Sequence, residues 1–93
     1  VRMNQEQRDA LKTLKISKGQ IEAAIKMIEE GRYCVDVSNQ IMATQSLLKK
    51  ANLLILKQHM NHCVMEAFEH DDEQDKQEKL DEVIGILSKI MGK

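Results

Sequence analysis

Residues 33–68 read YCVDVSNQIMATQSLLKKANLLILKQHMNHCVMEAF, and this stretch decides the fold. It contains no glycine or proline, the two residues that most often end a helix. Its marker positions recur four and three residues apart, which places them on one side of an α-helix. They are Val37, Ile41, Thr44, Leu48, Ala51, Ile55 and Gln58, with Leu47 and Leu54 widening the stripe. The pattern predicts one helix from near Tyr33–Asp36 to about Phe68.

A second helix is expected before this stretch, from Asn4 to Glu30. Asn4 and Gln7 have the spacing of a capping box, and Gly31 suits a left-handed helix stop. Its apolar positions are Leu11, Leu14, Ile21, Ala24, Ile25 and Ile28. Gly19 lies inside this helix and costs roughly 1 kcal/mol relative to Ala, which points to close packing or approach to a ligand.

A third, shorter helix is expected near the end of the chain. Residues 69–75 read EHDDEQD, a run acidic enough to form a hydrated loop. The helix would then span about Lys76 to Met91. Its apolar face is Leu80, Val83, Ile84, Leu87 and Ile90.

The composition agrees with an all-α protein made of a single domain, residues 1–93. The chain has no proline or tryptophan, and no two-residue alternation or Asn-Gly turn that would indicate strands. A chain of this length buries only about 60–65% of its extended surface, so oligomerisation or a bound metal is expected to stabilise it.

The length of the central helix points to a partner. Some 33 residues make a rod of about 50 Å. A single further helix of a 93-residue protomer cannot cover such a rod. The simplest partner is the same helix of a second copy, packed antiparallel.

Charge is distributed unevenly along the chain. Residues 1–57 carry ten Lys and Arg against six Asp and Glu, whereas residues 58–93 carry four against nine. Either both halves are solvated helix faces, or the cationic half meets a polyanion when several subunits combine their basic faces.

We expect a cytoplasmic protein. The longest strongly apolar run, Ala51 to Leu56, is too short to span a bilayer, and no signal-peptide pattern opens the sequence. Two cysteines in such a chain favour a reducing compartment, where cysteines more often bind metal or react than form structural disulfides.

The stretch HMNHC, residues 59–63, carries the candidate chemistry. His59 and Cys63 are four residues apart on the predicted helix, so their side chains project from one face about 6 Å apart. The only other cysteine, Cys34, lies 25 residues before His59, which is roughly 37 Å along a helix. An antiparallel helix pair would bring Cys34 of one chain beside His59 and Cys63 of the other.

Two thiolates and one imidazole form a soft three-coordinate set that suits Cu(I). Zn(II) would need a fourth ligand, which His62 or His70 could supply. We expect His62 to point away from Cys63, however, because neighbouring helical residues are offset by about 100°. His62 and His70 are therefore interpreted as surface or structural residues.

These residues also resemble those of a known family. The motif YCVDV at residues 33–37, the pair Gln40-Ile41, Gln45, and the spacing Cys34-x24-His59-x3-Cys63 are similar to the copper- and nickel-sensing repressors typified by the copper-sensitive operon repressor, CsoR. The resemblance includes Gly19-Gln20 and covers nearly the whole chain.

The resemblance implies an all-α homodimer that pairs into a homotetramer and represses transcription in the metal-free state. Cu(I) at Cys34, His59 and Cys63 would release operator DNA. Tyr33 matches a residue that lies beside the metal in the family, and Lys15, Lys18 and Lys50 match basic positions expected to meet DNA. No membrane, small-molecule substrate or enzymatic activity is implied.

Two positions depart from the family pattern. Thr13 stands where the first helix usually carries an arginine, so one DNA contact is absent or moved to Lys12. Lys79 stands where a glutamate commonly bonds the ligand histidine, and Glu78 or Glu82 could take its place.

Two other functions remain open at this point. Cys34 and Cys63 of opposing chains could form a disulfide or polysulfide bridge, as in a persulfide-sensing repressor, although His59 argues against this as the main role. The chain could also bind copper without binding DNA. An enzyme is not expected, because the sequence offers no nucleophile–base–orienter set.

Overall fold

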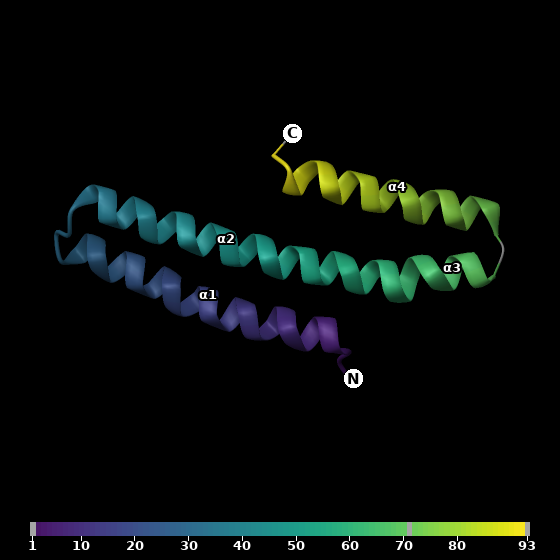
Figure 1. Ribbon diagram of the computed structural model, residues 1–93, viewed down its shortest axis with the longest axis horizontal. Helices are drawn as coiled ribbons and strands as arrows, with labels where there is room; N and C mark the ends of the chain where they lie inside the picture. Colours follow the sequence, from purple (N-terminus) through teal and green to yellow (C-terminus); the bar gives the residue numbers. More distant parts are fainter. Residues whose placement is uncertain (1, 71, 93) are drawn as a thin grey trace.

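The computed structural model describes residues 2–70 and 72–92, and the side chains of all of these except Cys63 and Val64. Every regular element in these residues is helical, as the sequence predicts. The elements are α1 (Gln5–Glu29), α2 (Cys34–Gln58), the π-helical segment η1 (His59–Val64), α3 (Met65–Glu69) and α4 (Glu73–Ile90). In Figure 1, α2, η1 and α3 form one continuous rod, with α1 antiparallel along its first half and α4 returning along its second half on the other side.

The boundaries of α1 follow the sequence prediction. The Asn4 side chain accepts a hydrogen bond from the Gln7 backbone N–H at 2.8 Å, and the Gln7 side chain accepts one from the Asn4 backbone N–H at 3.1 Å. This reciprocal pair confirms the capping box. Gly31 has φ +70°, the left-handed conformation in which a glycine ends a helix without strain.

The long rod is confirmed. The prediction that it is an uninterrupted α-helix is wrong, however, at the segment that carries His59 and Cys63. Residues His59–Val64 form a π-helical turn, in which backbone hydrogen bonds join residues five apart. The segment contains no glycine or proline, so no breaker in the sequence announces it. Compared with an uninterrupted α-helix, the π turn changes the rotation of the residues that follow it relative to those that precede it.

The interface between α1 and α2 consists of small residues. Its main buried positions recur every seven residues, with Ala10, Ser17 and Ala24 on α1 and Val37, Thr44 and Ala51 on α2, and Thr13 of α1 is buried as well. Small side chains let two helices approach closely, so larger ones are displaced to the flanks. The expected core residues Leu11, Leu14, Ile21, Ile25, Ile28, Ile41, Leu48 and Ile55 are accordingly exposed in the protomer.

A polar contact lies within this same interface. The Gln40 side-chain amide donates to the Gln20 backbone carbonyl at 3.1 Å and also to the Gln20 side-chain oxygen. Gln20 and Gln40 thus join α1 to α2 in one register. Gly19, beside Gln20, has no atom of another described residue within 4 Å of where a Cβ would lie, so packing inside the protomer does not account for it.

The start of α4 corrects the predicted boundary at Lys76. The Asp72 side chain accepts hydrogen bonds from the backbone N–H groups of Gln74 and Asp75, and α4 begins at Glu73. A carboxylate cap and acidic residues in a first turn stabilise a helix N-terminus, so part of the expected loop is helical. Asp71, also in that expected loop, lies outside the described residues. Of the predicted apolar face, only Val83 is buried, packed with Leu56, Ile86 and Ile90.

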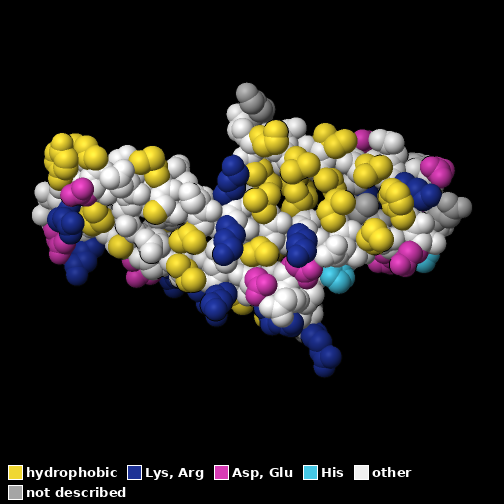
Figure 2. Space-filling view, viewed as in Figure 1, with side chains coloured by type: hydrophobic (Ala, Val, Ile, Leu, Met, Phe, Trp, Pro, Cys, Tyr) yellow, Lys and Arg dark blue, Asp and Glu magenta, His cyan; other side chains and the backbone are white. Residues whose placement is uncertain are grey.

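The protomer is a single layer of helices. Its extents are 58 × 32 × 13 Å, and the smallest is about the diameter of one helix. The radius of gyration is 17.5 Å, against about 12 Å for a compact domain of this length. Figure 2 shows hydrophobic side chains spread over one broad face, over the hairpin as well as over α4.

Within the described part of the chain, no helix combines the length and the apolar character needed to cross a membrane.

Candidate metal centre and nucleic-acid interface

Cys34 is the first residue of α2 and lies at the α1–α2 turn, at the opposite end of α2 from η1 (Figure 1). It is a free, exposed cysteine. It lines an open hollow of about 550 Å³ together with Ile28, Val37, Ile41, Met42 and Gln45. The wall of this hollow is largely apolar and its thiol is accessible, so the site around Cys34 can receive groups from outside the protomer.

His59, the first residue of η1, faces α4. Its Nε2 lies 3.3 Å from Oε2 of Glu82, and its side chain is 19% exposed. The contact lacks the angle of a hydrogen bond, and Nε2 is buried with no hydrogen-bond partner among the described residues. Glu82 in turn lies 3.9 Å from Nζ of Lys79.

Glu82 brings a carboxylate to His59, although Lys79 stands at the position where the family commonly has a glutamate. Glu82 follows Lys79 by one turn of α4, whereas Glu78 accepts a hydrogen bond from Gln74. A carboxylate beside one imidazole nitrogen favours the tautomer protonated there. An imidazole with its proton on Nε2 keeps a lone pair on Nδ1.

The structure says less about the other two predicted residues of the metal site, Cys63 and Tyr33. The side chain of Cys63 lies outside the described residues, and only its backbone, within η1, is placed. Tyr33 precedes α2 at the N-cap position and is 67% exposed. Among the side chains that the structure describes, no group of three His, Cys, Asp or Glu residues within one protomer could hold a metal ion.

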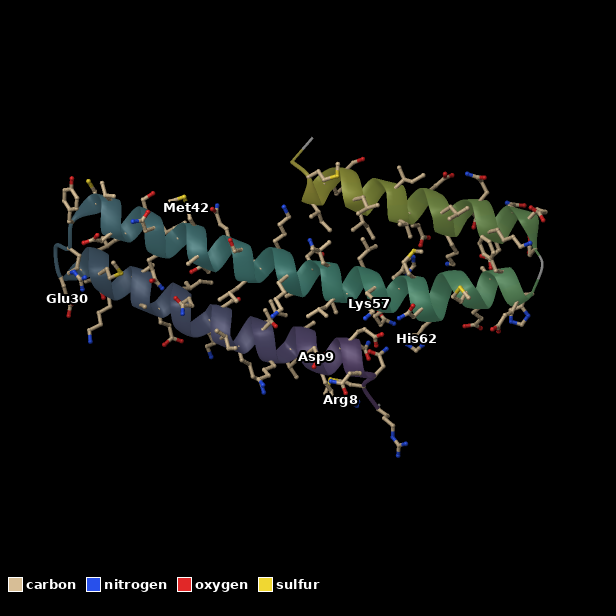
Figure 3. All side chains as sticks on the ribbon, viewed as in Figure 1. Arg8, Asp9, Glu30, Met42, Lys57 and His62 are labelled. Carbon is tan, nitrogen blue, oxygen red and sulfur yellow. The ribbon has the colours of Figure 1, made fainter. Side chains whose placement is uncertain are left out.

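His62 and His70, which the sequence analysis interprets as surface or structural residues, are both exposed. His62 lies on the side of the rod that faces the first turn of α1 (Figure 3), and its charge is one cause of the lowered pKa of Glu6. His70 lies 3.9 Å from Glu66 and is largely exposed.

Asn61 makes a contact that the sequence analysis missed. Its side-chain amide donates to Oε1 of Glu6 at 2.9 Å. The two residues are 55 positions apart, so no local sequence signal could have paired them.

The predicted DNA-binding lysines are all exposed on the hairpin. Lys15 lines a shallow hollow of about 420 Å³ on α1 with Arg8 and Lys12. Lys50 and Lys12 line a groove of about 270 Å³ between α1 and α2. Lys18 lies one turn after Lys15 on α1. In Figure 2, Lys and Arg side chains follow the lower edge of the layer, along α1.

The same groove accounts for the departure at Thr13. Thr13 is buried in the α1–α2 interface and also lines the groove, and its hydroxyl donates to the backbone carbonyl of Asp9 at 2.9 Å. The Thr13 side chain is neutral and places no positive charge in the groove. Lys12, its neighbour, lines the groove together with Lys50 and Asp9.

Residues 6–89 match the family described as "Metal-sensitive transcriptional repressor". The chain belongs to this family. Its members by this description are regulators of transcription, which agrees with the expectation of no enzymatic activity.

Individual relatives are copper sensors by name. The chain is 37% identical over 77 residues to the copper-sensing transcriptional repressor CsoR of Bacillus subtilis, covering 83% of this chain and 73% of that protein. It is 38% identical over 65 residues to CsoR of Mycobacterium ulcerans and 43% identical over 56 residues to RicR of Mycobacterium tuberculosis. These two matches cover 70% and 60% of this chain, and they span a little over half of each relative, 56% and 58%.

The fold has a counterpart among solved structures. The copper-sensing repressor CsoR with Cu(I) from Geobacillus thermodenitrificans superposes with a TM-score of 0.81 at 32% identity. The match covers 98% of this chain and 92% of that one. The metal-sensitive repressor fold thus extends over nearly the whole chain.

Proposed function

We propose that this protein is a metal-responsive transcriptional repressor that binds operator DNA when metal-free and is released by Cu(I). The observation that carries the proposal is the likeness, over 98% of the chain, to a copper-sensing repressor solved with Cu(I). Residues 1–93 would act as one metal-sensing and DNA-binding domain in the cytoplasm.

The proposed ligands are Cys34, His59 and Cys63, with Tyr33 beside them. Two thiolates and one imidazole suit a soft monovalent ion, and the buried, unbonded Nε2 next to Glu82 fits a histidine whose Nδ1 binds metal. A bound Cu(I) ion would supply bonds to soft donors from more than one helix. Glu82 would hold the imidazole in the required orientation.

The site is proposed to form between two chains. Cys34 and His59 lie at opposite ends of α2, roughly 37 Å apart for 25 residues of helix. A domain normally needs two packed layers to bury its apolar faces, and this protomer has one. An antiparallel homodimer would provide the second layer and bring Cys34 of one chain to His59 and Cys63 of the other. Two dimers would combine into a homotetramer.

The DNA-binding surface is proposed to be the basic edge of the hairpin. Lys15, Lys18 and Lys50 are its predicted members, and Lys12 joins them because it shares a groove with Lys50. Lysine ammonium groups bind phosphates as point charges, which gives affinity for DNA without recognition of its base sequence. In a symmetric tetramer these edges would combine into a surface more basic than the net charge of −1 suggests.

Fluorescence anisotropy with labelled operator DNA tests this proposal. The metal-free protein should bind, and stoichiometric Cu(I) should weaken binding about fivefold to 150-fold, as expected for a coupling of 1–3 kcal/mol. Cys34→Ala and His59→Ala should bind DNA in the absence of metal and lose the response to Cu(I). Equal DNA affinity of the wild-type protein with and without Cu(I) would disprove the mechanism.

A thiol-sensing repressor is the second candidate, favoured by the free and exposed thiol of Cys34. Persulfide treatment followed by mass spectrometry would then yield a linked peptide of Cys34 and Cys63. A copper-binding protein without DNA binding is distinguished by salt dependence, because phosphate contacts release counterions and give a steep decline of affinity with salt.

A further inference from the structure

The π-helical segment η1 is attached to two different helices on opposite sides. His59 faces Glu82 of α4, and Asn61, two positions later, donates to Glu6 of α1. Residues two apart on a helix project roughly 200° apart, which explains how one short segment reaches both neighbours. The segment that carries two proposed metal ligands is therefore connected directly to the helix that carries Lys12, Lys15 and Lys18.

The connection from η1 to α1 is made by side chains alone. Among the described residues, no Cα of α1 lies within 8 Å of a Cα of η1. The amide of Asn61 and the carboxylate of Glu6 bridge this separation with a 2.9 Å hydrogen bond. No other hydrogen bond joins these two elements in the part of the chain that the structure describes.

The Glu6 carboxylate is well suited to accept this bond. A backbone hydrogen bond at Glu6 and the Asn61 amide lower the pKa of Glu6, and the charges of His62 and Lys57 add to the effect. Figure 3 shows Lys57 and His62 reaching from the rod toward the N-terminal end of α1. Glu6 is therefore an anion at neutral pH, and hydrogen bonds to ionised groups are stronger than those between neutral groups.

We propose that the Asn61–Glu6 hydrogen bond couples the metal-ligand segment to the basic surface of α1. The inference rests on the proposed function, since Asn61 lies between the ligands His59 and Cys63. Holding these two residues on a metal fixes the backbone between them, and with it the position of Asn61. Glu6 lies in the capped first turn of α1, so a displacement there moves the helix as a rigid body.

The coupling requires a second arrangement of this segment, which an α-helical turn in place of the π turn would supply. A π-helical turn contains one residue more than the α-helical turn that it replaces, and changing between them rotates one side by about 100° relative to the other. A rotation of that size cannot keep both His59 against Glu82 and Asn61 against Glu6. Coupling between distant sites requires such a two-state element.

A single variant and a double variant that restores the wild-type charge test the connection. Asn61→Asp places a second carboxylate opposite Glu6 and breaks the bond. The double variant Glu6→Gln/Asn61→Asp restores it with reversed polarity, because the new amide donates to the new carboxylate. Gln74→Ala is the control, since it removes an exposed amide–carboxylate bond of the same kind, to Glu78 at 3.2 Å, within α4 alone.

Three quantities are measured for each protein: affinity for Cu(I), affinity of the metal-free protein for operator DNA, and the ratio of DNA affinities without and with Cu(I). We expect Asn61→Asp to reduce this ratio about threefold to tenfold, within the range found for residues that modulate coupling. The double variant should recover it, and Gln74→Ala should match the wild-type ratio. By linkage, DNA should also weaken Cu(I) binding less in Asn61→Asp.

The outcomes separate this inference from the proposed function. If the wild-type protein releases DNA on Cu(I) and Asn61→Asp does so to the same extent, the coupling role is overturned. If the wild-type protein does not respond to Cu(I), the proposed function fails. Amide hydrogen exchange then tests the coupling between η1 and α1. Cu(I) should change the exchange of residues 5–12 in the wild-type protein and should not change it in Asn61→Asp. If the two proteins do not differ in this way, the coupling role is overturned.

Discussion

At the scale of single residues, the contact between His59 and Glu82 is the most informative feature of the candidate site. The family resemblance puts Lys79 at the position of the glutamate that commonly bonds the ligand histidine, and leaves Glu78 and Glu82 as possible replacements. The structure selects Glu82, and Lys79 lies on its other side at 3.9 Å. A carboxylate next to a ligand histidine fixes the ring orientation and raises its basicity.

Replacing this carboxylate should weaken metal binding. We expect Glu82→Gln to lower Cu(I) affinity about tenfold to 100-fold, the usual effect of losing a partner of a ligand histidine. Glu78→Gln is the matched control, because Glu78 lies one turn earlier on α4 and bonds Gln74 instead. Competition with a coloured Cu(I) chelator measures both affinities. Equal affinities of the two variants would show that Glu82 does not position His59.

At the scale of helices, the hairpin of α1 and α2 depends on small residues at seven-residue intervals. Ala10 and Ser17 are each 1% exposed, which leaves no space for a larger side chain between the helices. The Ser17 hydroxyl donates to the Thr13 carbonyl at 2.9 Å, so this polar group is satisfied inside its own helix. The flanks of the hairpin carry the large apolar residues instead, which leaves them available for other helices.

This packing predicts different effects for two substitutions at one position. Ser17→Leu should destabilise the protein by about 1–3 kcal/mol, because added methylene groups in a closely packed interface force the helices apart. Ser17→Ala should change stability by less than about 1 kcal/mol, since the Thr13 carbonyl retains its helical hydrogen bond. Urea unfolding at one fixed protein concentration measures the difference. A tolerated leucine would contradict the close approach of α1 and α2.

At the scale of the whole molecule, the single-layer shape leaves most large apolar side chains uncovered. Leu48 is 40% exposed and lines a hollow of about 240 Å³ with Leu14, Ala51 and Ile55. Removing such apolar surface from water is the main stabilising contribution available to a chain of this size. The proposed homodimer would therefore stabilise the protein as well as form the metal site.

A charge placed in this hollow tests the assembly. Leu48→Glu should yield a smaller species with reduced helix content, because an unpaired carboxylate in an apolar interface is strongly unfavourable. Lys49→Glu, at the neighbouring exposed position, should retain the wild-type mass. Light scattering and circular dichroism over a range of protein concentrations measure both, and the wild-type melting temperature should rise with concentration. A Leu48→Glu protein of unchanged mass and stability would refute this assembly face.

The sequence alone was enough to predict the all-α class, the capped limits of α1, the extent of the rod and the residue types of the candidate site. These features depend on local hydrogen bonding and on periodicity, both of which are written in neighbouring residues. It also required Cys34 and His59 to be distant in one chain, because the rise of a helix is constant.

The tertiary structure alone shows which side chains meet across helices. It buried the small members of the predicted stripes, such as Ala24, Thr44 and Ala51, and left the large ones exposed, introduced the π turn at His59–Val64, and began α4 at Glu73. It also brought Glu82 to His59 and Glu6 to Asn61. The physical reason is that such contacts depend on the separation and rotation of packed helices, which distant segments set together and no local pattern records.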